Sequence, residues 1–371
     1  MTDRFARRRE LLRKSLHKEK IPSLLVQRET NVHWLTGFTG EDSILFLDPQ
    51  REILITDSRF VTQLADECPN LELVVRKTGR GTQTMDQAVA RTLKKLGIRS
   101  CGCEADTMTV GLRERIDENL KGKLDWVSTH ALIENLRAVK DAQEIREIRQ
   151  AVKIAEEAFV SCLDKLSPDE REIDFAHQLE QAIRNRGGSG HSFEPIVAVG
   201  PRAALPHGRA SHAKLGENPL LLVDWGARAN RYVSDLTRIV ITGKTHPKLE
   251  KIYRAVLAAQ KAAIAKIRPG VECSVVDAAA RNSIAAAGFG KYFGHGLGHG
   301  IGLDVHEMPR FNTTSTQILE PGMIVTVEPG IYLPGFGGVR LEDDVLVTKD
   351  GHEVLSTLPK SWNSTRAAWV T

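Results

Sequence analysis

The sequence has no run of about 18 consecutive apolar residues, the length that a membrane-spanning helix requires. Its first twenty residues also lack the apolar stretch and the small-residue cleavage site of a secretory signal. These absences argue against membrane association. We therefore expect a cytoplasmic protein.

Cysteine is scarce, with five residues in a chain of 371, and the five show no even spacing. Cys101 and Cys103 are separated by one residue, which is the wrong gap for a thioredoxin-type or zinc-ribbon pair. A disulfide scaffold is therefore excluded, and we expect thiols that are buried or have no chemical role. The glycines of the first 135 residues form neither a phosphate loop nor a GxGxxG motif, so no nucleotide site is indicated there.

The sequence also has no large excess of basic or acidic residues, because its net charge is only +4. Basic residues are concentrated between Arg4 and Lys14, but acidic residues interrupt them, and Leu12 and Leu16 follow at helical spacing. This pattern predicts a solvated amphipathic helix and not a nucleic-acid-binding arm. We expect no nucleic-acid partner.

Apolar residues make up 41% of the sequence and charged residues 26%, a composition typical of folded proteins. The length favours two domains, because one domain usually takes roughly 100 to 200 residues. Residues 1–135 alternate strand-like runs with helix-like ones, which predicts an α/β domain. The strand-like runs are SLLVQ, SILFL, EILIT, LELVV and LDWVS.

Residues 136–371 form the second predicted domain. One long amphipathic helix, residues 133–166, opens it, and a second helix within residues 171–188 ends at paired glycines. The rest is dominated by strands, with one pair of helices inserted at residues ~247–268 and ~274–287. The economical arrangement is a curved antiparallel sheet with helices on its outer face, so the fold class is α/β (α+β).

Two aspartates lie inside apolar strands that are joined by a short turn. If the turn is at Ala229 and Asn230, Asp224 and Asp235 lie directly opposite one another. A turn one residue later makes them diagonal neighbours on the same face. Two ionised carboxylates this close in an apolar setting repel, so one must take up a proton or a cation must bridge them.

The C-terminal part repeats this arrangement with glutamates. Glu328 follows the apolar run MIVTV, and Glu342 follows GVRL. Arg340 precedes Glu342 by two residues, so both side chains project to the same face of a strand. Taken singly, Glu328 could simply mark a strand that ends in a turn, and Glu342 could simply belong to an acidic edge of the sheet.

A histidine- and glycine-rich segment, YFGHGLGHGIGLDVHE, strengthens the functional interpretation. It holds His295, His299 and His306 within twelve residues. Five glycines in nine residues would cost a helix about 4 to 5 kcal/mol relative to alanine, so we expect an extended segment whose backbone approaches something bound. The zincin motif HExxH is excluded because Arg310 stands in place of the second histidine.

Four carboxylates and one imidazole form an oxygen-rich donor set. Such a set suits two divalent ions, Mn²⁺ first, with Co²⁺, Zn²⁺ or Fe²⁺ as alternatives, whereas structural zinc sites recruit thiolates. Four negative charges match two dications, which would acidify a bridging water.

With these segments in place, residues 133–347 resemble the pita-bread peptidases, the family of methionine aminopeptidase, aminopeptidase P and prolidase. The resemblance is carried by DWGA-x6-SD, GHG, VEPG and RLED. It implies that Asp224 chelates one ion, that Asp235 and Glu342 bridge both, and that His299 and Glu328 hold the other. It also implies that His207 steadies the scissile carbonyl or the leaving nitrogen.

The resemblance assigns three further residues. It implies that His295 and His306 line the substrate pocket and that Arg340 helps to position Glu342 and the substrate. The alternative for Arg340 is that it neutralises surplus carboxylate charge near the metals. One departure concerns the turn, which in the family usually has a glycine near Arg231, whereas this chain reads Ala229-Asn230-Arg231. Asn230 tolerates positive φ, so the hairpin can form.

The first domain, with NVHWLTGFTGEDSILFL and ITDSRF, resembles the N-terminal domain of aminopeptidase P, prolidase and creatinase. This likeness implies the proline-selective branch. It also implies a homodimer in which the WLTGFTGED loop of one subunit reaches its partner's pocket.

We therefore expect an Xaa-Pro aminopeptidase, which acts on peptides with proline in second position through a metal-bridging hydroxide. Glu328 is the candidate proton shuttle, and His207 and His306 the hydrogen-bond donors. A strict Xaa-Pro dipeptidase is the alternative and would need a cation to clamp the substrate's C-terminal carboxylate. A creatinase-like amidinohydrolase and a non-catalytic pita-bread binding protein are less favoured, because both are expected to lack metal ligands.

Overall fold

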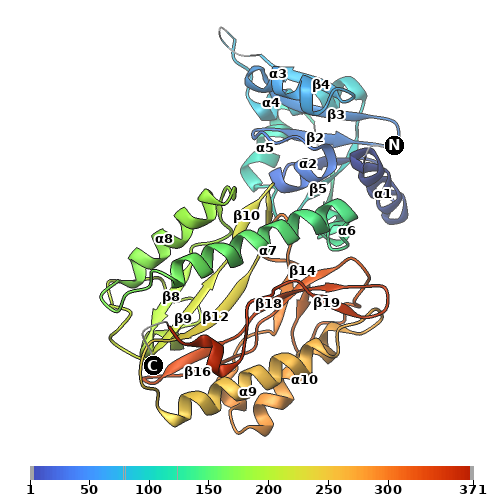
Figure 1. Cartoon of the computed structure of the whole chain (residues 1–371). Coiled ribbons are helices and arrows are strands. Elements are labelled where there is room, and N and C mark those ends of the chain that lie inside the picture. The colour runs from blue at the N-terminus through green and yellow to red at the C-terminus, as the bar shows by residue number, and fades with distance from the viewer. Residues whose placement is uncertain (1–3, 78, 80, 123, 368–371) are drawn as a thin grey trace. The chain divides into compact units, whose positions relative to one another are not determined.

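The computed structural model describes residues 4–77, 79, 81–122 and 124–367. The chain divides into two compact units, Met1–Arg137 and Ala138–Thr371 (Figure 1). Among the helices of the described residues, none is long and apolar enough to cross a membrane. All five cysteines are buried free thiols, as expected.

The first unit is the predicted α/β domain, built on one mixed six-stranded sheet in the order β4-β3-β2-β1-β5-β6. Its core packs β2 and β3 against apolar positions of α4, such as Val89 and Leu93. The elements are α1 (Arg4–Glu19), β1 (Leu24–Val26), α2 (Glu29–Thr36), β2 (Ile44–Leu47), β3 (Glu52–Asp57), α3 (Val61–Glu67), β4 (Glu72–Arg76), α4 (Met85–Leu96), β5 (Ser100–Glu104), α5 (Val110–Leu120), β6 (Asp125–Thr129) and α6 (Leu132–Arg137).

Helix α1 forms where the sequence predicts it, but two of its arginines are not solvated. Arg8 and Arg9 are 4% and 5% exposed. Their guanidinium groups donate to the carbonyl oxygens of Trp34 (3.0 Å) and Leu35 (2.8 Å). These carbonyls belong to the last turn of α2, where a helix leaves its acceptors unsatisfied and favours positive charge. Part of the basic cluster therefore stabilises a neighbouring helix.

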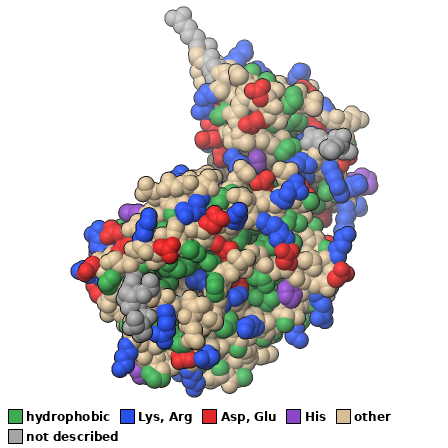
Figure 2. Space-filling view, in the orientation of Figure 1, with side chains coloured by type: hydrophobic (Ala, Val, Ile, Leu, Met, Phe, Trp, Pro, Cys, Tyr) green, Lys and Arg blue, Asp and Glu red, His purple; other side chains and the backbone are tan. Residues whose placement is uncertain are grey.

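The second unit is the predicted antiparallel strand-rich domain with flanking helices. In Figure 2, acidic and basic side chains are interspersed over its visible face. The elements are α7 (Ala142–Leu163), α8 (Glu172–Asn185), β7 (Gly190–His191), β8 (Ile196–Val199), η2 (Gly200–Ala204), β9 (Leu220–Trp225), β10 (Ala227–Ala229), β11 (Tyr232–Val233), β12 (Leu236–Ile241), α9 (Pro247–Ile264), α10 (Cys273–Ala286), β13 (Gly298–Gly300), β14 (Glu307–Phe311), β15 (Ile324–Val327), β16 (Gly330–Leu333), β17 (Gly337–Arg340), β18 (Asp343–Val347) and β19 (His352–Val354).

Strand β9 lies between two hydrophobic cores, and its alternating side chains serve both. Leu221 and Val223 pack with α7 and α8, whereas Leu220 and Leu222 pack with α9 and α10. Because side chains alternate with a period of two, Asp224 continues the face of Leu220 and Leu222. Asp224 therefore lies on the face of β9 that is turned away from α7 and α8.

The single long helix predicted for residues 133–166 is wrong, because the chain forms α6 and α7 with a break between them. Within the break, Val139 makes an antiparallel bridge to Met323, and Lys140 N–H donates to Gly322 O (3.0 Å). Asp141 then caps α7, accepting from the backbone N–H groups of Gln143 and Glu144. Strand pairing and a strong N-cap override the continuous helical periodicity.

The turn between β10 and β11 lies one residue later than the first of our two alternatives. Ala229 pairs with Tyr232, and Asn230 and Arg231 form the turn with positive φ angles of 47° and 73°. Thr237 consequently faces Asp224 across β9 and β12. Asp224 and Asp235 are therefore diagonal neighbours and not directly opposite, which is the second alternative.

Candidate metal centre

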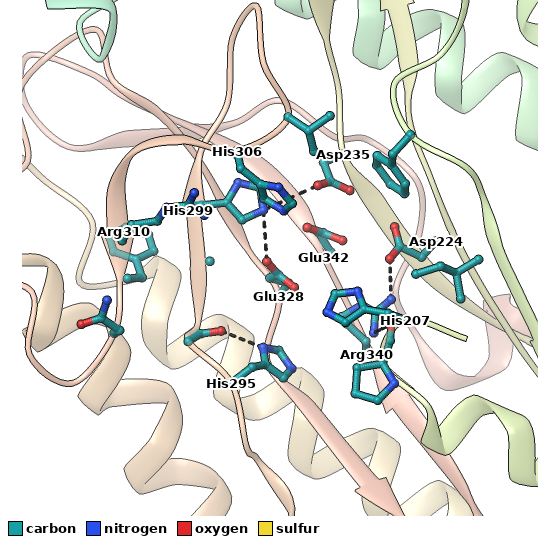
Figure 3. Close-up of a pocket in the computed structure, with 18 of the residues that line it drawn as sticks. His207, Asp224, Asp235, His295, His299, His306, Arg310, Glu328, Arg340 and Glu342 are labelled. Atoms are coloured by element: carbon teal, nitrogen blue, oxygen red, sulfur yellow. Dashed lines mark hydrogen bonds and ion pairs between the residues drawn. The ribbon is translucent and has the colours of Figure 1, made fainter. Parts of the chain in front are cut away.

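One pocket of about 560 Å³ in the second unit contains every site residue expected from the sequence (Figure 3). These residues come from six separate parts of the chain, and the fold brings all of them together. They are His207, Asp224, Asp235, His295, His299, His306, Glu328, Arg340 and Glu342.

The four carboxylates occupy the inner part of this pocket. Asp224, Asp235 and Glu342 are 7%, 5% and 1% exposed, and Glu328 is the least buried of the four. Asp224 lies in β9, and Asp235 directly precedes β12. Glu328 directly follows β15, and Glu342 lies between β17 and β18. A bridge between Thr237 and Glu342 holds the two pairs of strands together.

Burial and mutual repulsion make the ionised form of this cluster unfavourable. Burial raises the pKa of Asp235, and the nearby charges of Glu342 and Asp224 raise it further. The pKa of Glu342 is raised in the same way, and burial raises that of Glu328 to about 8. Burial also raises the pKa of Asp224, although Arg340 opposes this effect. Such a cluster requires protons or cations near neutral pH.

His299 lies on β13, whose glycines permit very close strand packing. A Cβ atom on Gly298 would lie 2.1 Å from Thr326 O, and one on Gly300 would lie 2.0 Å from Met308 O. The extended conformation expected for this segment is therefore present. The close neighbours of its backbone, however, are β14 and β15 of the same chain, not a bound molecule.

The hydrogen bonding of His299 indicates which ring nitrogen is free to bind a cation. Nδ1 lies 3.0 Å from Gly300 O, and a carbonyl can only accept, so Nδ1 carries the proton. Burial lowers the pKa of His299 to about 3, so the ring is neutral and Nε2 presents a lone pair. That lone pair lies 3.4 Å from a Glu328 oxygen and 3.7 Å from an Asp235 oxygen.

A lone pair that faces two carboxylates is stable only with a proton or a cation between them. Donor atoms of Asp235, His299 and Glu342 all lie within 4.8 Å of one another. Asp224 Oδ1 is buried and has no hydrogen-bond partner among the described residues. These buried oxygen and nitrogen donors fit divalent metal ions.

Arg340 connects the metal centre to a neighbouring tyrosine. Its guanidinium donates to a carboxylate oxygen of Asp224, to the Tyr332 hydroxyl (2.9 Å) and to Thr237 Oγ1 (3.0 Å). The Tyr332 hydroxyl in turn lies 3.0 Å from His295 Nε2. Because His295 Nδ1 faces Gly296 O, Nε2 is the acceptor for the tyrosine proton. Burial lowers the pKa of His295 to about 4, so this ring is neutral.

Three side chains lie at the more exposed part of the pocket. His207 and Arg310 are exposed, and so is His306, whose ring centroid is 4.4 Å from that of His299. Burial lowers the pKa of His306, which favours its neutral form.

Tyr332, Thr237 and Arg310 belong to this site but were not among the sequence candidates. Thr237 lies on β12, two residues after Asp235. Tyr332 lies on β16, two residues after Gly330. Strand parity could have suggested Thr237, because residues i and i+2 share a face. Tyr332 had no comparable pattern, because its role depends on contacts with distant residues.

Thr237→Val should weaken both the fold and the metal centre. Thr237 Oγ1 donates to Glu342 (2.6 Å) and accepts from Arg340, so valine leaves two buried charged groups short of a partner. We expect the free energy of unfolding to fall by about 1–3 kcal/mol and Mn²⁺ affinity to fall about tenfold. Urea denaturation and Mn²⁺ titration measure these effects. Thr348→Val is the matched control, and equal values for both variants would contradict the expectation.

Two family models match the chain. The model of metallopeptidase family M24 matches residues 146–349, and that of the creatinase/prolidase N-terminal domain matches residues 8–139. The chain therefore belongs to metallopeptidase family M24, in the prolidase and aminopeptidase P branch with a creatinase-type N-terminal domain.

Individual relatives match over nearly the whole chain. An uncharacterized peptidase of Bacillus subtilis, YqhT, is 38% identical over 95% of this chain and 98% of its own length. The structure of an Xaa-Pro dipeptidase from Bacillus anthracis is 38% identical, with a TM-score of 0.91 over 96% of this chain and 99% of that one. That of an X-Pro aminopeptidase from Thermotoga maritima is 33% identical, with a TM-score of 0.86 over 96% and 100%.

Proposed function

We propose that this protein is a metal-dependent Xaa-Pro dipeptidase, which hydrolyses the bond between an N-terminal residue and a C-terminal proline. Residues 136–371 carry the activity in this proposal, and residues 1–135 form the creatinase-type domain. The sequence led us to favour an aminopeptidase. Two observations support a dipeptidase. The B. anthracis relative is named an Xaa-Pro dipeptidase, and Arg310, a cation that can bind a C-terminal carboxylate, lines the pocket.

The observation that carries this proposal is the position of Arg310 in the pocket. This arginine lines the same pocket as the carboxylates, and its Cα pairs with that of His299 across β13 and β14. Within residues 4–367 as described, its guanidinium has no hydrogen-bond or ion-pair partner. A dipeptide ends in a carboxylate directly after the proline, and an arginine can bind that group with two parallel hydrogen bonds.

The metal ligands in this proposal are the five buried donors. Asp224 would hold one ion, Asp235 and Glu342 would be shared, and His299 and Glu328 would hold the other. Two divalent ions, with Mn²⁺ as the first choice, would supply Lewis acidity that polarises the scissile carbonyl and activates water.

The remaining residues bind the peptide and move protons. Glu328 accepts a proton and delivers it to the proline nitrogen, a role that suits a carboxylate whose pKa is raised. His207 and His306 donate hydrogen bonds to the substrate carbonyl as its charge increases. Arg340 holds Asp224, and Tyr332 keeps His295 in one orientation at the pocket wall.

Proline selectivity has a physical basis in the same pocket. A proline nitrogen has no N–H, so a site that relies on that donor cannot bind it well. Here the wall also includes Phe193, Ile196 and Val305, which offer an apolar surface to a ring.

A peptide series tests the proposal. With Mn²⁺, kcat/KM should be at least about tenfold higher for Ala-Pro than for Ala-Pro-Ala, because only the dipeptide places its carboxylate at Arg310. Arg310→Met should raise KM for Ala-Pro about 10- to 100-fold and remove the preference. Arg254→Met, on the outer helix α9, is the control. Equal turnover of both peptides by the unmodified protein would reject the dipeptidase assignment.

An Xaa-Pro aminopeptidase is the second candidate, favoured by the likeness to the T. maritima structure. Faster turnover of Ala-Pro-Ala than of Ala-Pro would support it. The creatinase-like and non-catalytic alternatives are disfavoured by the presence of all five donors in one pocket. A homodimer with the loop of residues 34–42 at the partner's pocket stays a prediction, for which light scattering is the measurement.

A further inference from the structure

The segment of residues 199–211 carries His207 into the pocket. The His207 ring makes no hydrogen bond to the described residues, and the side chain is exposed. Leu205, two residues earlier, is 53% exposed. Because no partner fixes the ring itself, its position depends on how the backbone of this segment is held.

A buried glutamate holds both ends of that segment. Glu172, in the first turn of α8, is 0% exposed. Its carboxylate accepts from Val199 N (2.7 Å) at one end and from Ser211 N (2.8 Å) and Ser211 Oγ (2.6 Å) at the other. Arg202, inside the segment, forms an ion pair with it at 3.0 Å. One side chain therefore closes the loop.

The middle of the segment lies against β17 at the metal centre. A Cβ atom on Gly338 would lie 2.1 Å from Ala203 O, so no side chain fits between the segment and the strand. Arg340, on the same strand, donates to Pro206 O at 3.4 Å. The segment is thus held by Glu172 at its ends and by β17 in its middle, with His207 directly after Pro206.

Hydrogen bonds to a charged acceptor are stronger than neutral ones. A buried carboxylate is stable only when such bonds and an opposite charge compensate its lost hydration. Glu172 has this compensation only while the segment is closed. The contacts of the Glu172 carboxylate therefore stabilise the closed conformation of the segment.

We propose that Glu172 is a positioning residue for His207, which it keeps in the pocket by closing the segment of residues 199–211. This inference depends on the proposed function, because the role of His207 as a hydrogen-bond donor belongs to that proposal. Glu172 itself does not line the pocket, so it acts on the reaction only through the segment.

A double-mutant cycle tests the connection. Glu172→Gln should lower kcat for Ala-Pro about tenfold and leave KM within about twofold. A displaced His207 no longer donates its hydrogen bond to the substrate carbonyl in the transition state. In a His207→Ala background the same change should have no further effect on kcat. Asp174→Asn, in the same turn of α8, is the control and should match the unmodified protein. An equal loss from Glu172→Gln in both backgrounds would overturn the proposal.

Proteolysis supplies a readout that does not require activity. Trypsin should cut Glu172→Gln after Arg202 or Arg209 at least about tenfold faster than the unmodified protein, because the loop opens more often. Unchanged cleavage would overturn the proposal. If no Xaa-Pro peptide is hydrolysed but the cleavage rate rises as expected, the proposed function fails while the closing role of Glu172 stands. Should Glu172→Gln not fold, Ser211→Ala removes one donor and should change both readouts in the same directions, about threefold.

Discussion

Asp235→Asn should lower kcat/KM for an Xaa-Pro dipeptide by about 10³-fold, a loss of about 4 kcal/mol of transition-state stabilisation. Asp235, His299 and Glu342 hold donor atoms within 4.8 Å of one another. Asparagine keeps the shape of the side chain but removes the negative charge with which a divalent ion would be held. The assay is steady-state kinetics with Mn²⁺, together with metal analysis of the purified variant.

The same substitution should stabilise the metal-free protein. Burial raises the pKa of Asp235, and the charges of Glu342 and Asp224 raise it further, so the ionised cluster opposes folding. Removing one member should increase the free energy of unfolding at pH 8 by about 1 kcal/mol or more, the equivalent of one pKa unit. Loss of activity with a gain in stability distinguishes a metal ligand from a structural residue.

Asp350→Asn is the control for Asp235→Asn, because Asp350 is exposed in the turn after β18. It should change neither activity nor stability. Retention of more than about a tenth of the activity in Asp235→Asn would contradict its role as a shared ligand.

Removal of metal should make the stability of this protein fall as the pH rises from about 7 to about 9, above the range in which its histidines take up protons. The pKa of Glu328 is raised to about 8, and those of Asp235 and Glu342 are raised well above their usual values. In this window the folded state therefore holds protons that the unfolded state has lost. Stability from such groups is present at low pH and is lost as the pH rises through the folded pKa values, here on the order of 3 kcal/mol.

Mn²⁺ should reverse this trend, because a metal ion replaces the protons that the folded cluster holds. Its affinity should increase with pH over the same window. Thermal unfolding of chelator-treated and Mn²⁺-loaded protein at pH 5.5, 7 and 8.5 measures both effects. A metal-free melting temperature that stays constant or rises between pH 7 and pH 8.5 would show that the carboxylates do not repel one another in the folded state.

The sequence was informative where polar residues interrupt strongly apolar strands. Asp224 and Asp235 were identifiable because carboxylates within runs such as LLLVDW and YVSD need a reason to be buried. The glycines around His299 excluded a helix, which is why an extended strand was expected. Both inferences depend on local periodicity and propensity, which a single sequence displays.

The remaining features depend on contacts between distant segments. The break before α7 arises from pairing between Val139 and Met323, which helical periodicity cannot indicate. The turn at Asn230 and Arg231 required positive φ at an arginine, an unusual choice that sequence reasoning does not favour. Glu172 looked like any acidic residue in the first turn of a helix, although it is fully buried beneath the segment of His207.

The close packing of β13 against its neighbours gives the glycines and the histidine of the motif around His299 different roles. The glycines serve strand packing, and the histidine serves the proposed chemistry. Gly298 and Gly300 are needed because backbone oxygens of adjacent strands occupy the space of a side chain, whether or not an ion is held. A descendant of this protein that lost its hydrolytic chemistry would still need both glycines to fold. The glycine pattern is therefore a marker of architecture, and the imidazole between the two glycines is the marker of the proposed metal site.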